Sequence, residues 1–201
     1  MNTLILLLAW LTCSAASITP REERALLLAF KSDGRAWDEG GVLSTWSESG
    51  ATCDWEGLTC DELGHVQLLY LGRQGLSGTV PAAFNNLRSL SRLDLSNNQL
   101  TGSLPASWSS MGNMNLLLLS GNNIAGTLPH QYNAMNNLEW LYLSGNRLSG
   151  IIPPQWASLT QLRSLQVQDN CLEIPVPEAI ANITYARLPA LCAPPHAEQC
   201  G

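Results

Sequence analysis

The sequence has few charged side chains and little positive charge. Only 13% of its 201 residues are charged, and 10 lysines and arginines stand against 16 aspartates and glutamates. The formal net charge is -6, and the isoelectric point estimated from the sequence is 4.9. No run of basic residues is present, so the charge pattern argues against nucleic acid as a partner.

Convergent polar groups, which catalysis needs, are also scarce. His65, His130 and His196 fall at unrelated positions of the repeat described below, too far apart to share a metal ion or to activate a nucleophile. Two of the carboxylates expected on strands, Asp94 and Glu139, are separated by at least ~9 Å. We therefore expect no enzymatic activity, no metal site and no cofactor.

Long apolar runs are missing apart from a short one at the amino end. The segment from Leu4 to Leu11 is apolar, and Ser14 and Ala16 behind it suit signal cleavage, so residues 1–16 are expected to be a secretory signal. An uncleaved anchor is the alternative, although the run is shorter than the ~20 residues that span a bilayer. The chain ends at Gly201 without an apolar tail, so we expect no lipid anchor and an extracellular, secreted protein.

A repeat of 24 residues occupies most of the remaining chain. Its registers open at Val66, Leu90, Met114, Leu138 and Leu162. Four positions recur in it: Gln74, Asn98, Asn122, Asn146 and Asn170 at position 9; Leu76, Leu100, Ile124, Leu148 and Leu172 at position 11; Pro81, Pro105, Pro129, Pro153 and Pro177 at position 16; Phe84, Trp108, Tyr132, Trp156 and Ile180 at position 19. A fixed period of this length indicates a solenoid, with an amino-terminal cap at 17–65, repeats at 66–185 and a carboxy-terminal cap at 186–201.

The repeat predicts the shape of each coil. The apolar residues at positions 1, 4, 6 and 11 point inward, and the LxL segment forms one strand of a parallel sheet, at 69–71, 93–95, 117–119, 141–143 and 165–167. The asparagine side chain satisfies backbone groups at the bend after the strand, and glycine at position 13 permits a second turn. The expected fold is a curved right-handed solenoid with one parallel sheet on its concave face and helical or irregular structure on its convex side.

Before the repeats, a helix is expected over REERALLLAFK. Thr19 and Glu22 form a capping box with Pro20 in the first turn. Leu27 and Phe30 should pack on the first coil and close the core.

The repeat identifies the chain as a leucine-rich repeat protein of the 24-residue plant type. Within that class, Trp108 and Met111 in LPASWSSM and Trp156 in IPPQWASL resemble the promastigote surface antigen family of kinetoplastid parasites. The resemblance implies a surface or released protein that engages other macromolecules.

Five cysteines remain once the signal and Cys13 are removed. CDWEGLTC resembles the amino-terminal cap of plant-type repeats, which implies a disulfide between Cys53 and Cys60. LCAPPHAEQC resembles the carboxy-terminal cap, which implies that Cys192 pairs with Cys200 and leaves Cys171 as a thiol or an intermolecular bridge. A Cys171 to Cys192 pairing is the alternative.

The candidate binding site is the concave face. Side chains at positions 3 and 5 of each coil should point outward there. The site residues selected from them are Leu68, Tyr70, Arg92, Asp94, Leu116, Leu118, Trp140, Tyr142 and Gln166. An exposed apolar patch is formed by Leu116, Leu118, Trp140 and Tyr142, and such a patch usually marks a binding site. The alternative is that glycans, a loop or self-association covers the patch. Asn182 lies in a glycosylation sequon and is expected on the convex flank.

These features predict a secreted or surface-associated protein that recognises a protein or glycan through its concave face, with no nucleic acid and no membrane span. Two alternatives stay open. The chain could be an inhibitor of a secreted polysaccharide-degrading enzyme, as some plant-type repeats are, or a structural component of a coat.

Overall fold

The computed structural model describes residues 18–32, 41–173, 176–181, 183 and 185–187. The expected signal segment, the sequon asparagine Asn182, and Cys192 and Cys200 lie outside these residues, as does nearly all of the expected carboxy-terminal cap.

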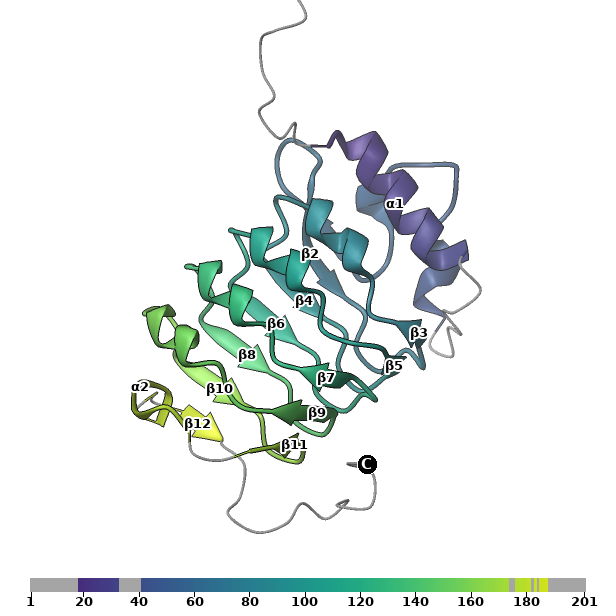
Figure 1. Ribbon diagram of the computed structural model, residues 1–201. Helices are drawn as coiled ribbons and strands as arrows, with labels where there is room; N and C mark the ends of the chain where they lie inside the picture. Colours follow the sequence, from purple (N-terminus) through teal and green to yellow (C-terminus); the bar gives the residue numbers. More distant parts are fainter. Residues whose placement is uncertain (1–17, 33–40, 174–175, 182, 184, 188–201) are drawn as a thin grey trace, which may run out of the picture.

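The described chain is a solenoid built around one seven-stranded sheet (Figure 1). The strands, in spatial order, are β1 (Leu58–Cys60), β2 (Val66–Tyr70), β4 (Arg92–Asp94), β6 (Leu116–Leu118), β8 (Trp140–Tyr142), β10 (Ser164–Gln166) and β12 (Tyr185–Arg187). All neighbours pair in parallel except β1, which is antiparallel to β2. The five predicted strands are therefore present, and β12 adds a sixth parallel strand after the fifth coil.

All five strands end one residue earlier than the sequence predicted. Each strand closes at position 5, because the chain begins to bend at position 6. The backbone N–H at position 6 still donates a hydrogen bond to the next strand. Leu95 N–H donates to the Leu118 carbonyl at 2.9 Å, and Leu119 N–H donates to the Tyr142 carbonyl at 2.8 Å. The predicted LxL strands thus agree with the hydrogen bonding, although the paired segment is shifted toward the amino end.

Two smaller parallel sheets lie on the flank of the solenoid, and sequence reasoning had expected only one sheet. One contains β3 (Ser77–Thr79) and β5 (Gln99–Thr101), and the other contains β7 (Ala125–Thr127), β9 (Arg147–Gly150) and β11 (Cys171–Leu172). Short 3-10 helices then return the chain toward the next coil, at Ala82–Asn86, Ala106–Ser110, His130–Ala134 and Pro154–Ser158, and the α-helix α2 (Glu178–Ala181) follows in the fifth coil. The expectation of a helical convex side is confirmed.

The asparagine ladder forms as predicted. Asn122 is 7% exposed, its Oδ1 accepts the Leu100 N–H at 3.0 Å, and its Nδ2 donates to the carbonyls of Leu95 at 2.9 Å and Leu119 at 3.1 Å. One amide thus bonds three backbone groups in two successive coils, and without it the buried Leu100 N–H would have no partner. Asn146 makes the corresponding bonds one coil later.

The amino-terminal cap combines α1 (Pro20–Ser32) with two 3-10 turns, Val42–Thr45 and Thr52–Asp54. The capping box is confirmed: the Thr19 N–H donates to the Glu22 carboxylate at 2.7 Å, and the Glu22 N–H donates to Thr19 Oγ1 at 3.3 Å. The Thr19 N–H, together with the Thr19 hydroxyl that donates to the same carboxylate at 2.8 Å, holds the pKa of Glu22 below its usual value. Leu27 is fully buried and Phe30 packs edge-on against Phe84, so α1 closes the core at this end, as expected.

A buried carboxylate that sequence reasoning did not single out joins α1 to the sheet. Glu23 is 1% exposed, and its Oε2 accepts the Val66 N–H at 2.8 Å. Its Oε1 lies 3.1 Å from His65 Nδ1. The first strand of the repeats is thereby tied to the cap helix.

The structure confirms one predicted disulfide and contradicts one cysteine assignment. Cys53 and Cys60 form a disulfide with a Cα–Cα distance of 5.6 Å, as predicted. Cys171 is also disulfide-bonded, so its assignment as a free thiol is wrong. Its partner is not among the described residues. Position 10 lies on the flank, in β11, where Cys171 is half-buried.

Candidate functional site

The concave face consists of two rows of side chains that cross the sheet. In β6 and β8 the central leucine is fully buried, while the residues before and after it are partly exposed. Pairing between strands places these outward residues in register. One row is Leu68, Arg92, Leu116, Trp140 and Ser164, of which Ser164 is buried, and the other is Tyr70, Asp94, Leu118, Tyr142, Gln166 and Arg187.

The apolar patch predicted on this face is contiguous. Leu116 is directly opposite Trp140, and Leu118 is opposite Tyr142. All four are half-buried, so the expectation that they are exposed is only partly correct, since side chains on adjacent parallel strands cover one another. Tyr70, which lies beyond a charged strand, is the more open residue at 38% exposure.

The charged strand between Tyr70 and this patch is β4. Asp94 accepts the Ser96 N–H at 2.8 Å and leans over the neighbouring coil, where a Cβ added to Gly72 would come within 2.9 Å of its Oδ2. Arg92 is exposed. The carboxylate is thus held by its own turn, while the guanidinium faces solvent.

A small polar network borders the apolar patch at position 2 of the coils. The Glu139 carboxylate accepts a hydrogen bond from Asn115 Nδ2 at 2.8 Å and forms an ion pair with Arg163 Nε at 3.0 Å. Sequence reasoning had placed Glu139 among the strand carboxylates but did not foresee these partners, because it did not compare position 2 between coils.

A hollow of about 520 Å³ lies at the carboxy-terminal end of the concave face. Trp140, Tyr142 and Gln166 line it, together with Ser164, Ala181, Ile183, Ala186 and Arg187. Sequence reasoning placed the first three on this face but missed Arg187, because β12 lies outside the repeat pattern and carries no LxxLxL signal.

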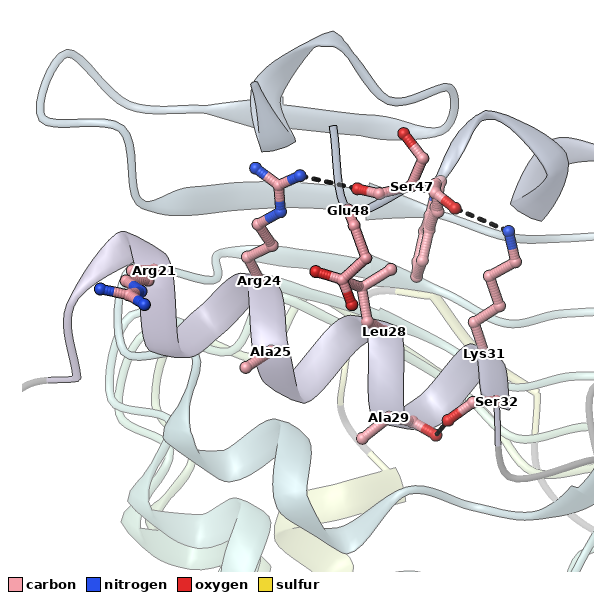
Figure 2. Close-up of a pocket in the computed structure, with 10 residues that line it drawn as sticks. Arg21, Arg24, Ala25, Leu28, Ala29, Lys31, Ser32, Ser47 and Glu48 are labelled. Carbon is pink, nitrogen blue, oxygen red and sulfur yellow. Dashed lines mark hydrogen bonds between the residues drawn. The ribbon is translucent and has the colours of Figure 1, made fainter. Parts of the chain in front are cut away.

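A larger hollow, of about 930 Å³, lies beside α1 (Figure 2). Two of its three cations are already used: Arg24 donates to the carbonyls of Gly50 at 2.6 Å and Ser47 at 2.7 Å, and Lys31 Nζ donates to the Trp46 carbonyl at 2.6 Å. Figure 2 shows both side chains reaching from the helix to this loop. The arrangement holds the loop of the cap, so we assign it a structural role.

Two other kinds of feature were sought in the described part of the chain. No three histidine, cysteine, aspartate or glutamate side chains gather there as a metal site would require. None of the helices in those ranges has the length and apolar character needed to cross a bilayer.

Comparison with known families divides the chain as the fold does. Residues 20–61 match the leucine rich repeat N-terminal domain family, and residues 64–124 and 137–159 match leucine rich repeat families.

Similar proteins of known sequence and structure come from Arabidopsis thaliana. The leucine-rich repeat receptor protein kinase EMS1 is 34% identical over 100 residues, which is 49% of this chain but 8% of that kinase. The BIR2 ectodomain superposes with a TM-score of 0.76 at 28% identity, covering 84% of this chain and 94% of its own. A chain of the BIR3–SERK2 complex gives a TM-score of 0.72 at 31% identity, covering 85% and 95%.

These relatives overturn the resemblance to kinetoplastid surface antigens. The position 19 aromatics that suggested it are set by packing inside the solenoid: Trp108 Nε1 donates to the Pro81 carbonyl at 3.2 Å, and Trp156 Nε1 to the Pro129 carbonyl at 3.0 Å. A residue chosen by such a contact carries little information about lineage. The chain belongs to the leucine-rich repeat ectodomain family of plant receptor kinases.

Proposed function

We propose that this chain is an extracellular recognition module that binds a protein partner through its concave face and carries no catalytic step of its own. The observation that carries the proposal is the patch of Leu116, Leu118, Trp140 and Tyr142. The coils bury leucine at position 4 to fill the core, so core packing gives no reason for apolar residues at positions 3 and 5. Contiguous apolar surface of this kind usually serves an interface.

The relatives support a protein as the partner. The BIR3–SERK2 structure is a complex of two proteins, and its matched chain superposes on 85% of this chain with a TM-score of 0.72. A disulfide in the cap, Cys53 to Cys60, suits an oxidising extracellular compartment. Because the chain spans less than a tenth of the length of EMS1, a kinase function is not carried over to it.

The test compares two truncations of exposed apolar residues. Trp140→Ala removes the largest side chain of the patch, whereas Ile151→Ala removes an apolar side chain that is 51% exposed just beyond β9 on the flank. Extracellular proteins captured by the parent chain are identified, and the affinity of each variant is measured by calorimetry. Aromatic hot spots often contribute ~2 kcal/mol, so Trp140→Ala should bind roughly thirtyfold more weakly, while Ile151→Ala should bind as the parent does.

The opposite pattern would place the partner elsewhere. If Ile151→Ala abolishes capture and Trp140→Ala leaves it unchanged, the interface lies on the flank and the concave-face proposal is wrong. Circular dichroism of both variants shows whether the fold is retained.

A further inference from the structure

The geometry points to the hollow at the junction of β8, β10 and β12 as an anchor site for an acidic and apolar polypeptide segment. The inference rests on the proposed function and makes it more specific. The segment would place an apolar side chain against Trp140 and Tyr142 and a side-chain carboxylate on Arg187.

The apolar part of the site is formed by side chains from β8 and from the segment around α2. Trp140 and Tyr142 present their half-buried rings from β8, and Ile183 with Ala181 and Ala186 closes the side that follows α2. A hollow of about 520 Å³ with this lining accepts one side chain of a partner and not a whole domain. Gln166, on the strand between β8 and β12, offers an amide donor and acceptor to a peptide backbone.

The charged part of the site is Arg187. Two other arginines are already used: Arg24 is bonded to cap carbonyls, and Arg163 is paired with Glu139. Within the described ranges, the Arg187 guanidinium has no hydrogen bond or ion pair, and it lines the hollow. In a chain with a net charge of -6, this unpaired cation in the same hollow as two aromatic rings selects for a carboxylate, which a guanidinium can bind through two parallel hydrogen bonds.

The strand spacing sets the distance between the two groups. Tyr142 and Arg187 are in register on β8 and β12, with β10 between them. Two strand spacings are about 9.6 Å, and an extended chain advances about 3.3 Å per residue. The carboxylate should therefore lie about three residues from the apolar side chain along an extended segment.

Selection of phage-displayed random heptapeptides on the purified chain tests this spacing directly. We expect enriched peptides that carry Asp or Glu about three residues from an aromatic or aliphatic residue. Arg187→Gln should weaken their binding about tenfold, the loss of one charge-assisted contact. Arg21→Gln is the matched control, because Arg21 is exposed on α1 away from the hollow, and it should leave the affinity unchanged.

The outcomes separate this inference from the proposed function. Peptides that need Trp140 but contain no acid, or that bind Arg187→Gln as well as the parent, would overturn the carboxylate site and leave concave-face recognition standing. A selection without any Trp140-dependent peptide would overturn both. Resynthesised peptides with an amidated terminus should lose affinity on Glu→Gln exchange; dependence on the free terminal carboxylate alone would contradict a side-chain carboxylate.

Discussion

Two neighbouring columns of the solenoid differ sharply in composition. Position 4 is leucine in all five coils and is fully buried: Leu69, Leu93, Leu117, Leu141 and Leu165. Position 3, one residue earlier on the same strands, holds leucine, arginine, leucine, tryptophan and serine. Each position 4 side chain packs against the same neighbours in the coils on either side, so its size and apolar character are fixed. The side chains at position 3 do not fill the core and are free to differ from coil to coil. The variation at position 3, beside a column of constant leucine, therefore marks where this fold can be specialised for a ligand.

The largest expected difference in the free energy of unfolding is between Trp156→Ala in the core and Trp140→Ala on the concave face. Trp156 is 1% exposed, donates to the Pro129 carbonyl at 3.0 Å and stacks on Tyr132 at 6.3 Å between centroids. Trp156→Ala opens a cavity and should lower the free energy of unfolding by about 3–5 kcal/mol. Trp140→Ala deletes the same group from a half-buried site and should cost about 1 kcal/mol. Guanidinium unfolding of both variants gives the two values, and equal losses would show that Trp140 belongs to the core.

A substitution in the asparagine ladder should have the next largest effect. Asn122→Leu removes one acceptor and one donor group, leaving the Leu100 N–H without a partner and the Leu95 and Leu119 carbonyls short of one hydrogen bond each. We expect a loss of about 1–3 kcal/mol in the free energy of unfolding. Asn123→Leu is the control, because the neighbouring side chain is half-buried and outside the ladder. If thermal unfolding of the two variants coincides, the ladder does not contribute to stability.

The repeat made most of the solenoid predictable from sequence. The leucine columns, the asparagine bonds and the turns at Gly78 and Gly102, where φ is 93° and 79°, follow from a period that samples the same packing problem five times. Features that occur once had no such signal. The burial of Glu23 against β2 and the position of Arg187 depend on contacts between unlike segments, which a repeat pattern cannot encode.

The candidate site was predicted in part. The outward alternation of strand residues placed Trp140 and Tyr142 correctly, because the pleat fixes which side of a sheet each residue faces. The degree of exposure was overestimated, since it depends on how neighbouring side chains shield one another. The state of Cys171 was also missed, because resemblance to a cap motif gave a pairing that left it unpaired.

The smallest effect expected lies within the position 19 column itself. Trp108 and Trp156 donate to proline carbonyls of the preceding coil, whereas the Tyr132 hydroxyl, in the coil between them, is buried without a hydrogen-bond partner. Tyr132→Phe keeps the ring and removes an unsatisfied group, so it should raise the free energy of unfolding by about 1 kcal/mol at neutral pH.

Burial also raises the pKa of Tyr132 far above its ordinary value. A raised folded pKa means that the stability linked to the neutral phenol is present below the unfolded value of about 10 and is lost as the pH rises above it. The advantage of Tyr132→Phe should therefore grow between neutral pH and pH ~11 in urea titrations; a constant difference would show that the phenol ionises as readily in the folded protein as in the unfolded chain.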